Sequence, residues 1–233
     1  KEPPLNEVVS GLSFEKLPKL RTAYLGLLWE KFSNDYPTTE DAPIFALPRK
    51  DAPLEITDTL RPPRVWFVHK DENELIQVQQ DWFIYNWRRQ KGEDVYPHYE
   101  HVIGRLKNCF GKFKEFLQER DMGPAVIKEC MLTYINHIPI EERRDSLQDL
   151  HNIFVDLRQP SDKERFLPTP SNIAWVREYP MPDAKGSLVA KLNTGIRRLD
   201  NKPVLILELS ARGFCADGSE DAPWTWFDLA HEW

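Results

Sequence analysis

Two short basic segments contain the side chains best placed for chemistry in this sequence. The first directly follows an aromatic run, Trp82–Trp87, and the second lies late in the chain. Aromatic rings can stack on nucleic-acid bases while neighbouring cations hold phosphates. The alternative is a solvated strand end whose aromatic side chains belong to the core. The candidate nucleic-acid-binding residues are Arg88, Arg89, Lys91, Arg197 and Arg198.

Two further patterns are candidates for metal chemistry. His98 and His101 are spaced so that both can face one side of a helix and bind a metal ion. No nearby Cys or third His completes a tetrahedral set, so we interpret them as a polar first turn and predict no metal. Glu208 lies in an apolar run without the acid-x-Lys pair typical of metal-dependent nucleases. We expect it to be a hydrogen-bonded or edge-facing carboxylate.

The sequence offers no signature of nucleophilic catalysis or of cofactor binding. Cys109, Cys130 and Cys215 are widely spaced, which predicts buried free thiols in a reducing compartment. The 10 glycines form neither the dinucleotide-binding pattern G-x-G-x-x-G nor a phosphate-binding P-loop. The nucleophile elbow G-x-S-x-G is absent as well. We therefore predict no cofactor and expect an interaction protein more than an enzyme.

The composition is that of a packed protein with a mild negative charge. The 233 residues carry a formal net charge of -6, and 41% of them are hydrophobic. The negative charge opposes attraction to nucleic acid or anionic lipid. No apolar run approaches the roughly 20 residues needed to cross a bilayer, and no secretory signal opens the chain. We therefore predict a cytoplasmic protein without membrane contact.

Hydrophobic patterning in the first half predicts a strand, a helix, three strands and a second helix. The opening Pro3–Phe14 reads as a strand, and the helix after it has an apolar stripe at helical spacing. Residues 37–63 are rich in proline and predict an extended surface loop. The three strands form an antiparallel meander. The expected stripe comprises Leu20, Tyr24, Leu27 or Leu28, and Phe32, and the expected strands are Arg64–His69, Glu74–Gln79 and Trp82–Arg88.

The second helix of this half carries the clearest pattern in the sequence. It follows Tyr96-Pro97 and ends before Gly123-Pro124, as proline and glycine commonly delimit helices. Apolar residues recur along it every three or four positions, which predicts one buried face. The residues of that face are Tyr99, Val102 or Ile103, Leu106, Phe110, Phe113 and Leu117.

The second half repeats this order of elements without recognisable sequence identity. A long strand is predicted at Ala125–Asn136, a short helix around Glu141–Phe154, and a loop over residues 158–172. The tail from Asp221 reads as the opening of a helix, and we expect the native chain to continue past Trp233. Between loop and tail we expect three more strands, at Ile173–Tyr179, Ser187–Arg198 and Pro203–Ser210.

These elements predict an α+β fold in which helices cover one face of an antiparallel sheet. We divide it into two pseudo-repeated halves, residues 1–122 and 123–233, packed as one compact unit. Two such halves side by side would form a long curved sheet whose other face is available for binding. A face of that shape suits a partner, although shape alone does not identify one.

Three segments resemble a bacterial protein family described only as sporadically distributed. They are the opening Pro3-Pro4-Leu5-x-Glu7-Val8-Val9, the aromatic strand Trp82–Trp87, and Ala230-His231-Glu232 near the end. The resemblance covers nearly the whole chain, but it carries over no catalytic residues. Patchy occurrence among bacteria implies a role in conflict with phage or mobile DNA.

Two functions follow as hypotheses. The first is a non-enzymatic interaction, sensor or adaptor protein with a protein partner, within a bacterial anti-phage defence assembly. The second is a nucleic-acid-binding or nuclease component that uses the basic and aromatic end of the meander. The sequence leaves both open.

Overall fold

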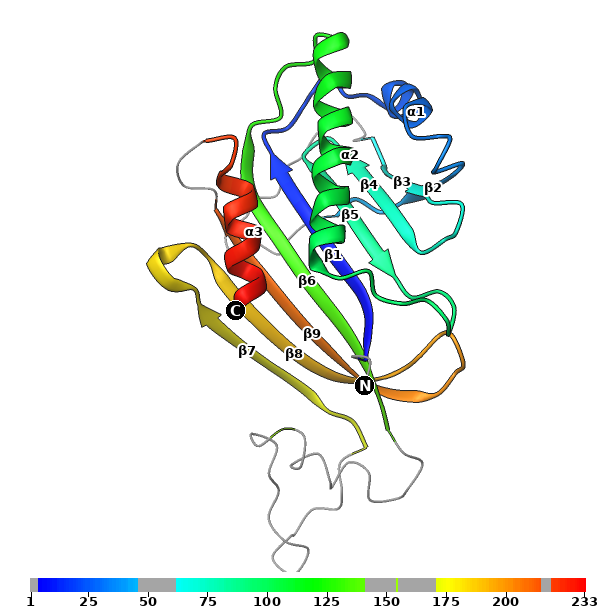
Figure 1. Ribbon diagram of the computed structural model, residues 1–233, viewed down its shortest axis with the longest axis vertical. Coiled ribbons are helices and arrows are strands. Elements are labelled where there is room, and N and C mark those ends of the chain that lie inside the picture. Colours follow the sequence, from blue (N-terminus) through cyan, green and yellow to red (C-terminus); the bar gives the residue numbers. More distant parts are fainter. Residues whose placement is uncertain (1–3, 46–61, 141–153, 155–170, 215–218) are drawn as a thin grey trace, which may run out of the picture.

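The computed structural model describes residues 4–45, 62–140, 154, 171–214 and 219–233. Over these residues the chain forms one open sheet of nine antiparallel strands, together with three α-helices (Figure 1). The helices are α1 (Thr22–Glu30), α2 (Tyr99–Glu119) and α3 (Ala222–Glu232). The strands are β1 (Leu5–Phe14), β2 (Thr38–Ala42), β3 (Arg64–Val68), β4 (Glu74–Gln79), β5 (Trp82–Arg88), β6 (Ile127–Pro139), β7 (Ala174–Pro180), β8 (Ser187–Ile196) and β9 (Pro203–Phe214).

The strand order across the sheet is β2-β3-β4-β5-β1-β6-β9-β8-β7. In the first half, the meander β3-β4-β5 ends beside β1, and in the second half β7-β8-β9 ends beside β6. The antiparallel pair β1–β6 joins the halves, with Ser10 opposite Leu132. The predicted α+β class and the antiparallel sheet are confirmed, whereas the internal repeat stays a prediction.

All three helices lie on one face of the sheet, in front of the strands in Figure 1. The face of α2 toward the sheet is apolar and includes every residue of the predicted stripe, as well as Cys109 and Phe116. The ring centre of Phe113 lies 5.6 Å from that of Phe14 on β1 and 5.2 Å from that of Phe83 on β5. Burial of these rings therefore holds α2 against the middle of the sheet.

Helix α1 is shorter than the sequence predicts, and part of its expected stripe is wrong. The helix begins at Thr22, so Leu20 lies before it, although Leu20 is fully buried. Leu25 and Leu28 are the residues of α1 that enter the core, while Tyr24 is 37% exposed. Leu20 thus reaches the core from the segment before the helix and Leu28 reaches it from the helix itself, so one helical period does not describe both.

The prediction of a continuous loop over residues 37–63 is wrong at its beginning. Thr38–Ala42 forms the edge strand β2 and pairs with β3, with Glu40 opposite Trp66. Its sequence has few strand-forming apolar residues, so pairing with β3 decides its conformation. Residues 46–61 lie outside the described residues, as does the predicted helix around Glu141–Phe154 except for Phe154 itself.

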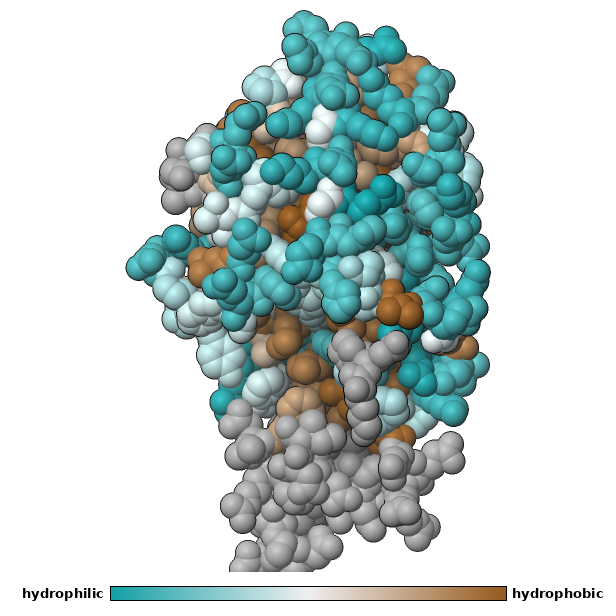
Figure 2. Space-filling model, in the orientation of Figure 1, coloured by the Kyte–Doolittle hydropathy of each residue, from teal (hydrophilic) through white to brown (hydrophobic). Residues whose placement is uncertain are grey.

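Figure 2 shows that the helix-covered face is mostly polar over the helices. Apolar side chains are visible lower in this view. Beyond the main core, a separate apolar cluster surrounds Leu192 and Leu205 on this face, and Phe154 packs against it. Within the described ranges, no helix is both long enough and apolar enough to cross a membrane.

Candidate interaction surface

The sheet face opposite the helices is the candidate site, and its two halves differ. Side chains alternate between the two faces along each strand. Trp82 and Ile84 of β5 and Met131 of β6 form a buried cluster on this face, and Phe45 packs on it with its ring 5.3 Å from that of Trp82. Phe45 therefore covers this cluster on the face opposite the helices.

A side-chain amide holds this cover in place. Gln79 Nε2 donates to the carbonyl of Phe45, and the Phe45 N–H donates to Gln79 Oε1, each at 2.9 Å. The Gln79 amide thus bonds both backbone groups of Phe45, as a neighbouring strand would. Gly11 on β1 leaves room beneath, because a Cβ there would lie 3.2–3.4 Å from Ile84, Trp82 and Met131.

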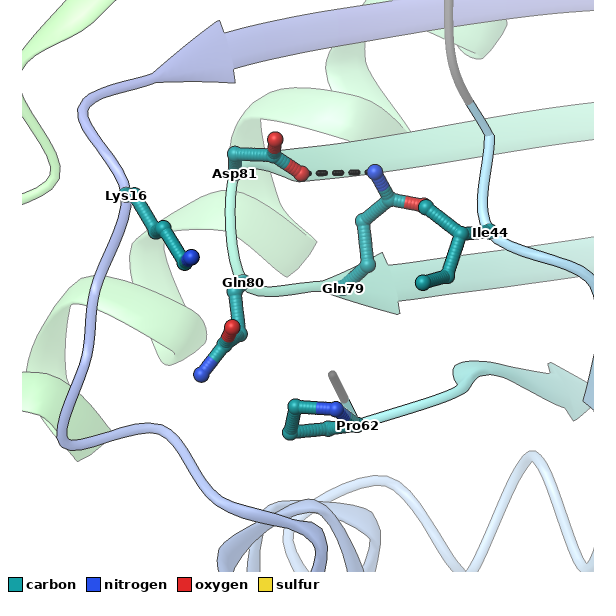
Figure 3. Close-up of a pocket in the computed structure, with 6 residues that line it drawn as sticks. All are labelled: Lys16, Ile44, Pro62, Gln79, Gln80 and Asp81. Atoms are coloured by element: carbon teal, nitrogen blue, oxygen red, sulfur yellow. Dashed lines mark hydrogen bonds between the residues drawn. The ribbon is translucent and has the colours of Figure 1, made fainter. Parts of the chain in front are cut away.

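A small hollow beside this cover is too small for a ligand (Figure 3). Its volume is about 10 Å³, which is near the minimum that one water molecule needs. Figure 3 shows the side chains of Gln79 and Asp81 joined by a hydrogen bond at its rim, 2.6 Å long. The hollow is a packing gap.

In the second half, the same face forms an open groove with a volume of about 1050 Å³. The residues that line it come from β6, β7, β8, β9 and the turn between β7 and β8. Their side chains include charges of both signs and several apolar groups. They are Glu129, Glu178, Pro180, Met181, Ala184, Gly186, Ser187, Val189, Lys191, Ser210, Arg212, Gly213 and Phe214.

The charges in and beside the groove are largely matched within the chain. Lys191 Nζ lies 2.9 Å from Glu208 Oε1 on the neighbouring strand. Arg212 Nε lies 3.8 Å from Glu129 Oε1 and makes no hydrogen bond in the described part of the chain. Phe214, by contrast, is 64% exposed. The groove therefore offers ion pairs and apolar surface together, without a net positive field.

One end of the groove is shaped by the β7–β8 turn, which includes a short 3₁₀ helix, Pro182–Ala184. Asp183 and Ala184 both have φ of 55°, a left-handed conformation that costs free energy in residues with side chains. Trp226 of α3 donates its indole N–H to the carbonyl of Lys185, at 2.9 Å. A Cβ at Gly213 would clash with that carbonyl and with the indole nitrogen, so glycine is needed where α3 meets the turn.

The predicted basic residues of the first half lie at the end of β5, away from the groove. Arg88 Nε donates to the carbonyl of Glu72, at 3.0 Å. Arg89 bonds through its backbone N–H to the carbonyl of Asn6, and Lys91 is exposed. The aromatic residues before them are buried, Trp87 with 2% exposure, so these rings belong to the core.

The other two predicted residues lie in the β8–β9 turn. Arg197 forms an ion pair with Asp200, with Nη2 2.5 Å from Oδ2, and Arg198 is exposed. By strand alternation, Arg88 and Arg197 both lie on the sheet face opposite the helices. The pKa of His137 is lowered, mainly by burial and to a lesser degree by the nearby positive charge of Arg197. Nucleic-acid binding by this end of the sheet stays a prediction.

The remaining chemical candidates have structural partners. The His98 ring lies tilted beside that of Tyr96, with ring centres 5.6 Å apart, whereas His101 Nε2 lies 3.8 Å from Glu74 Oε1. The described residues contain no group of three or more His, Cys, Asp or Glu side chains that could hold a metal. Cys109 and Cys130 are buried free thiols, and burial raises the pKa of Cys109 to about 11. Cys215 lies outside the described residues.

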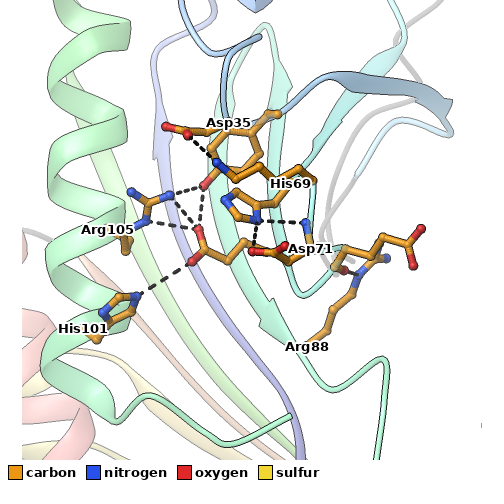
Figure 4. A network of polar contacts seen from close by, with 10 residues as sticks. Asp35, His69, Asp71, Arg88, His101 and Arg105 are labelled. Carbon is orange, nitrogen blue, oxygen red and sulfur yellow. Dashed lines mark hydrogen bonds and ion pairs between the residues drawn. The ribbon is translucent and has the colours of Figure 1, made fainter. Parts of the chain in front are cut away.

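A polar network joins α2 to the start of β4 (Figure 4). Arg105 donates to Glu74 Oε2 from Nη2 at 2.7 Å and from Nε at 3.1 Å, and Tyr36 donates to the same oxygen at 2.8 Å. Burial would raise the Glu74 pKa, but the hydrogen bonds from Arg105 and Tyr36 outweigh it and the pKa is lowered. Because Arg105 and Tyr36 of the same chain already bind the Glu74 carboxylate, we interpret this network as structural.

A second polar cluster fixes the end of α3 against α2 and β6. Tyr99 donates to Asp228 Oδ1 at 2.9 Å, and its ring stacks on His231 with centres 3.9 Å apart. The Tyr134 hydroxyl lies 2.8 Å from His231 Nδ1. Burial raises the pKa values of Tyr99 and Tyr134, so both phenols stay neutral. Neutral phenols that are already hydrogen-bonded suit attachment of the helix better than acid–base chemistry.

Glu7 lies on the sheet face opposite the helices and has a raised pKa. Burial raises its pKa, against the opposing effects of a hydrogen bond from Asn86, at 2.5 Å, and the charge of Arg88. Because the folded pKa lies above the unfolded value, the stability associated with the protonated form is present below the unfolded pKa. That stability is lost as pH rises through the folded pKa.

We therefore expect Glu7→Gln to stabilise the protein at pH 7, because a neutral amide can still accept from Asn86 without the cost of a buried charge. The advantage should shrink as the pH falls toward 4. Urea unfolding at both pH values measures it, with the exposed Glu115→Gln as control. An advantage that grows in acid would contradict the assignment.

The groove residues were missed by sequence reasoning, although part of the signal was present. In a strand over Ser187–Arg198, alternation of the side chains places Val189 and Lys191 on one face and their neighbours in the sequence on the other. Nothing local places Glu129 and Arg212 beside them, because this depends on the register of β6, β9 and β8.

No protein-family model matches the sequence, and the comparison with curated proteins finds no match. The resemblance to the sporadically distributed bacterial family therefore stays a prediction. The groove and its surroundings are the basis for the functional argument.

Proposed function

We propose that this chain is a non-enzymatic interaction protein, an adaptor or sensor, that holds an extended segment of a partner protein in the groove on β7, β8 and β9. The observation that carries the proposal is the difference between the two halves. On the sheet face opposite the helices, Phe45 covers the cluster of Trp82, Ile84 and Met131, whereas the part of this face on β7, β8 and β9 forms an open groove.

The chemistry of the groove suits a polypeptide. Val189, Pro180 and the exposed Phe214 offer apolar contacts. The charged side chains of the groove are of both signs, and Lys191 and Arg212 already lie beside Glu208 and Glu129. A phosphate backbone would require an excess of cations, which the two acidic and two basic side chains lining the groove do not provide.

The proposal is tested by photocrosslinking in the native host. A photoreactive amino acid at position 189 should capture one protein, while the same probe at position 199 should not. Val189 lies in the groove, and Leu199 is 52% exposed in the β8–β9 turn. Two outcomes would count against the proposal. One is that the probes at both positions capture protein equally, and the other is that the probe at position 189 captures no partner.

With the captured protein purified, Phe214→Ser should weaken binding about tenfold, the loss expected if this ring is one of the few interface residues whose truncation costs more than about 1 kcal/mol. Leu199→Ser is the matched control, because it removes a similarly exposed apolar side chain elsewhere. Titration calorimetry measures both. Unchanged affinity for Phe214→Ser would place the contact outside the groove.

A second candidate is nucleic-acid binding at the sheet end that carries Arg88 and Arg197. The supporting observation is that the two lie on one face, although Arg88 donates to Glu72 and Arg197 pairs with Asp200. Binding that falls steeply with salt and weakens in Arg88→Ala and Arg89→Ala would favour this candidate. The predicted link to phage defence is tested by the gene neighbourhood.

A further inference from the structure

The two edges of the sheet differ in how well they resist pairing with another strand. Edge strands are commonly protected by shortness or by charge. The edge strand β2 has five residues and contains the adjacent acids Glu40 and Asp41. The other edge, β7, has seven residues and is almost entirely exposed. It includes Trp175, Val176 and Tyr179, and its adjacent charges, Arg177 and Glu178, are of opposite sign, unlike the two acids of β2. In the described part of the chain, no strand pairs with the outer side of β7.

The hydrogen bonds flanking β7 show which residues face outward. The Thr194 N–H donates to Ile173 O at 3.1 Å, and the Met181 N–H donates to Gly186 O at 2.9 Å. Antiparallel strands alternate between residues bonded to one neighbour and residues bonded to the other. The backbone groups of Ala174, Val176 and Glu178 therefore point to the outer edge. Pro180 follows this series, where its missing N–H costs no bond to β8.

We infer that β7 pairs with β7 of a second copy of this chain, antiparallel, about a two-fold axis at Val176. Ala174 then lies opposite Glu178 of the second copy, and Val176 lies opposite its equivalent. Each pair can exchange both of its backbone hydrogen bonds.

The side chains favour this register over registers with an axis at Arg177 or at Glu178. An axis at Val176 places Trp175 opposite Arg177 of the second copy, and a guanidinium over an indole is attractive. Within one chain, Arg177 already lies over the ring of Trp175 at 5.3 Å. An axis at Arg177 or at Glu178 would place like charges directly opposite each other, which destabilises a strand pair.

Such an axis is perpendicular to the sheet, so it keeps the helices of both copies on one face and both grooves on the other. The pairing itself does not rest on the proposed partner. It concerns the purified chain alone, so its failure and the failure of partner binding are separate results.

Sedimentation equilibrium of the purified chain tests the inference. The wild type should dimerise in a concentration-dependent manner. Val176→Lys should weaken the dimer at least about tenfold, because two cations would meet at the axis. Val176→Thr is the control that keeps a strand-forming residue, and circular dichroism checks that each variant is folded.

A crosslink provides a second measurement. In a Cys215→Ser background, Val176→Cys should form a disulfide-linked dimer under mild oxidation, since paired residues at this position have Cα atoms about 5.5 Å apart. Leu199→Cys, similarly exposed, should crosslink much more slowly. A wild type that stays monomeric at high concentration, a dimer insensitive to Val176→Lys, or equal crosslinking at positions 176 and 199 would overturn the inference.

Discussion

Replacement of Phe113 by alanine is expected to lower the free energy of unfolding by about 4 kcal/mol, a value within the range found when buried Phe side chains are truncated to alanine. The Phe113 ring is fully buried and packs between Phe14 and Phe83, with Phe110 at 5.9 Å on the same helix. Its removal leaves a cavity where α2 meets both β1 and β5. Because these neighbours belong to rigid elements, the site cannot collapse to fill the cavity.

Chemical denaturation measures this effect, and the thermal midpoint should fall by about 10 °C for a chain of this size. Glu115→Ala is the matched control, since Glu115 is exposed on the same turn of α2. It should change stability by less than about 0.5 kcal/mol. A loss below about 1 kcal/mol for Phe113→Ala would show that this ring does not hold the helix on the sheet.

Arg105→Met is the second change with a large expected effect, about 3 kcal/mol of destabilisation. The substitution leaves Glu74, whose side chain is 13% exposed, without its cation. The Tyr36 hydroxyl still donates to the carboxylate, and His101 and His69 lie farther from it, but none of them replaces the guanidinium. Breaking one side of a buried ion pair costs more than the pair itself contributes, because the remaining charge is desolvated without compensation.

Acid provides an independent readout of the same network. The Glu74 pKa is lowered in the folded wild type, so its contribution to stability is present above the unfolded pKa and is lost as pH falls through the folded pKa. Without Arg105, burial is left to raise that pKa. The penalty of Arg105→Met should therefore shrink in acid.

The matched control is Lys70→Ala. Lys70 pairs with Asp35 at 3.3 Å, but both side chains are at least half exposed, so the loss should be far smaller than that of Arg105→Met. Urea titrations at pH 7 and pH 4 compare the three proteins. Equal losses for Arg105→Met and Lys70→Ala would show that the Glu74 network is a surface pair in solution.

The elements that sequence reasoning predicts well are those whose burial is decided by a local period. The stripe of α2 from Tyr99 to Leu117 is one case, since each of its residues faces the same sheet. The same reasoning fails at Tyr24, where a residue with helical spacing faces solvent. The strand β2 was missed because pairing with β3, and not its own composition, makes it a strand.

The groove could not be predicted because its residues meet only across strands. Glu129 precedes Arg212 by more than eighty positions, and they come together through the β6–β9 register. The basic residues were visible in the sequence, but the partners of Arg88 and Arg197 were not. Glu72 and Asp200 engage them through short turns whose geometry a charge pattern does not describe.

The strand order also determines when the sheet can form during synthesis. Because β5 pairs with β1, the first half can complete its strands and α2 within Leu5–Glu119, before β6 leaves the ribosome. At that stage β1 is bonded on one side only. The nascent chain therefore carries an open edge at β1 until β6 is made, and this interval is when it is most exposed to pairing with other chains.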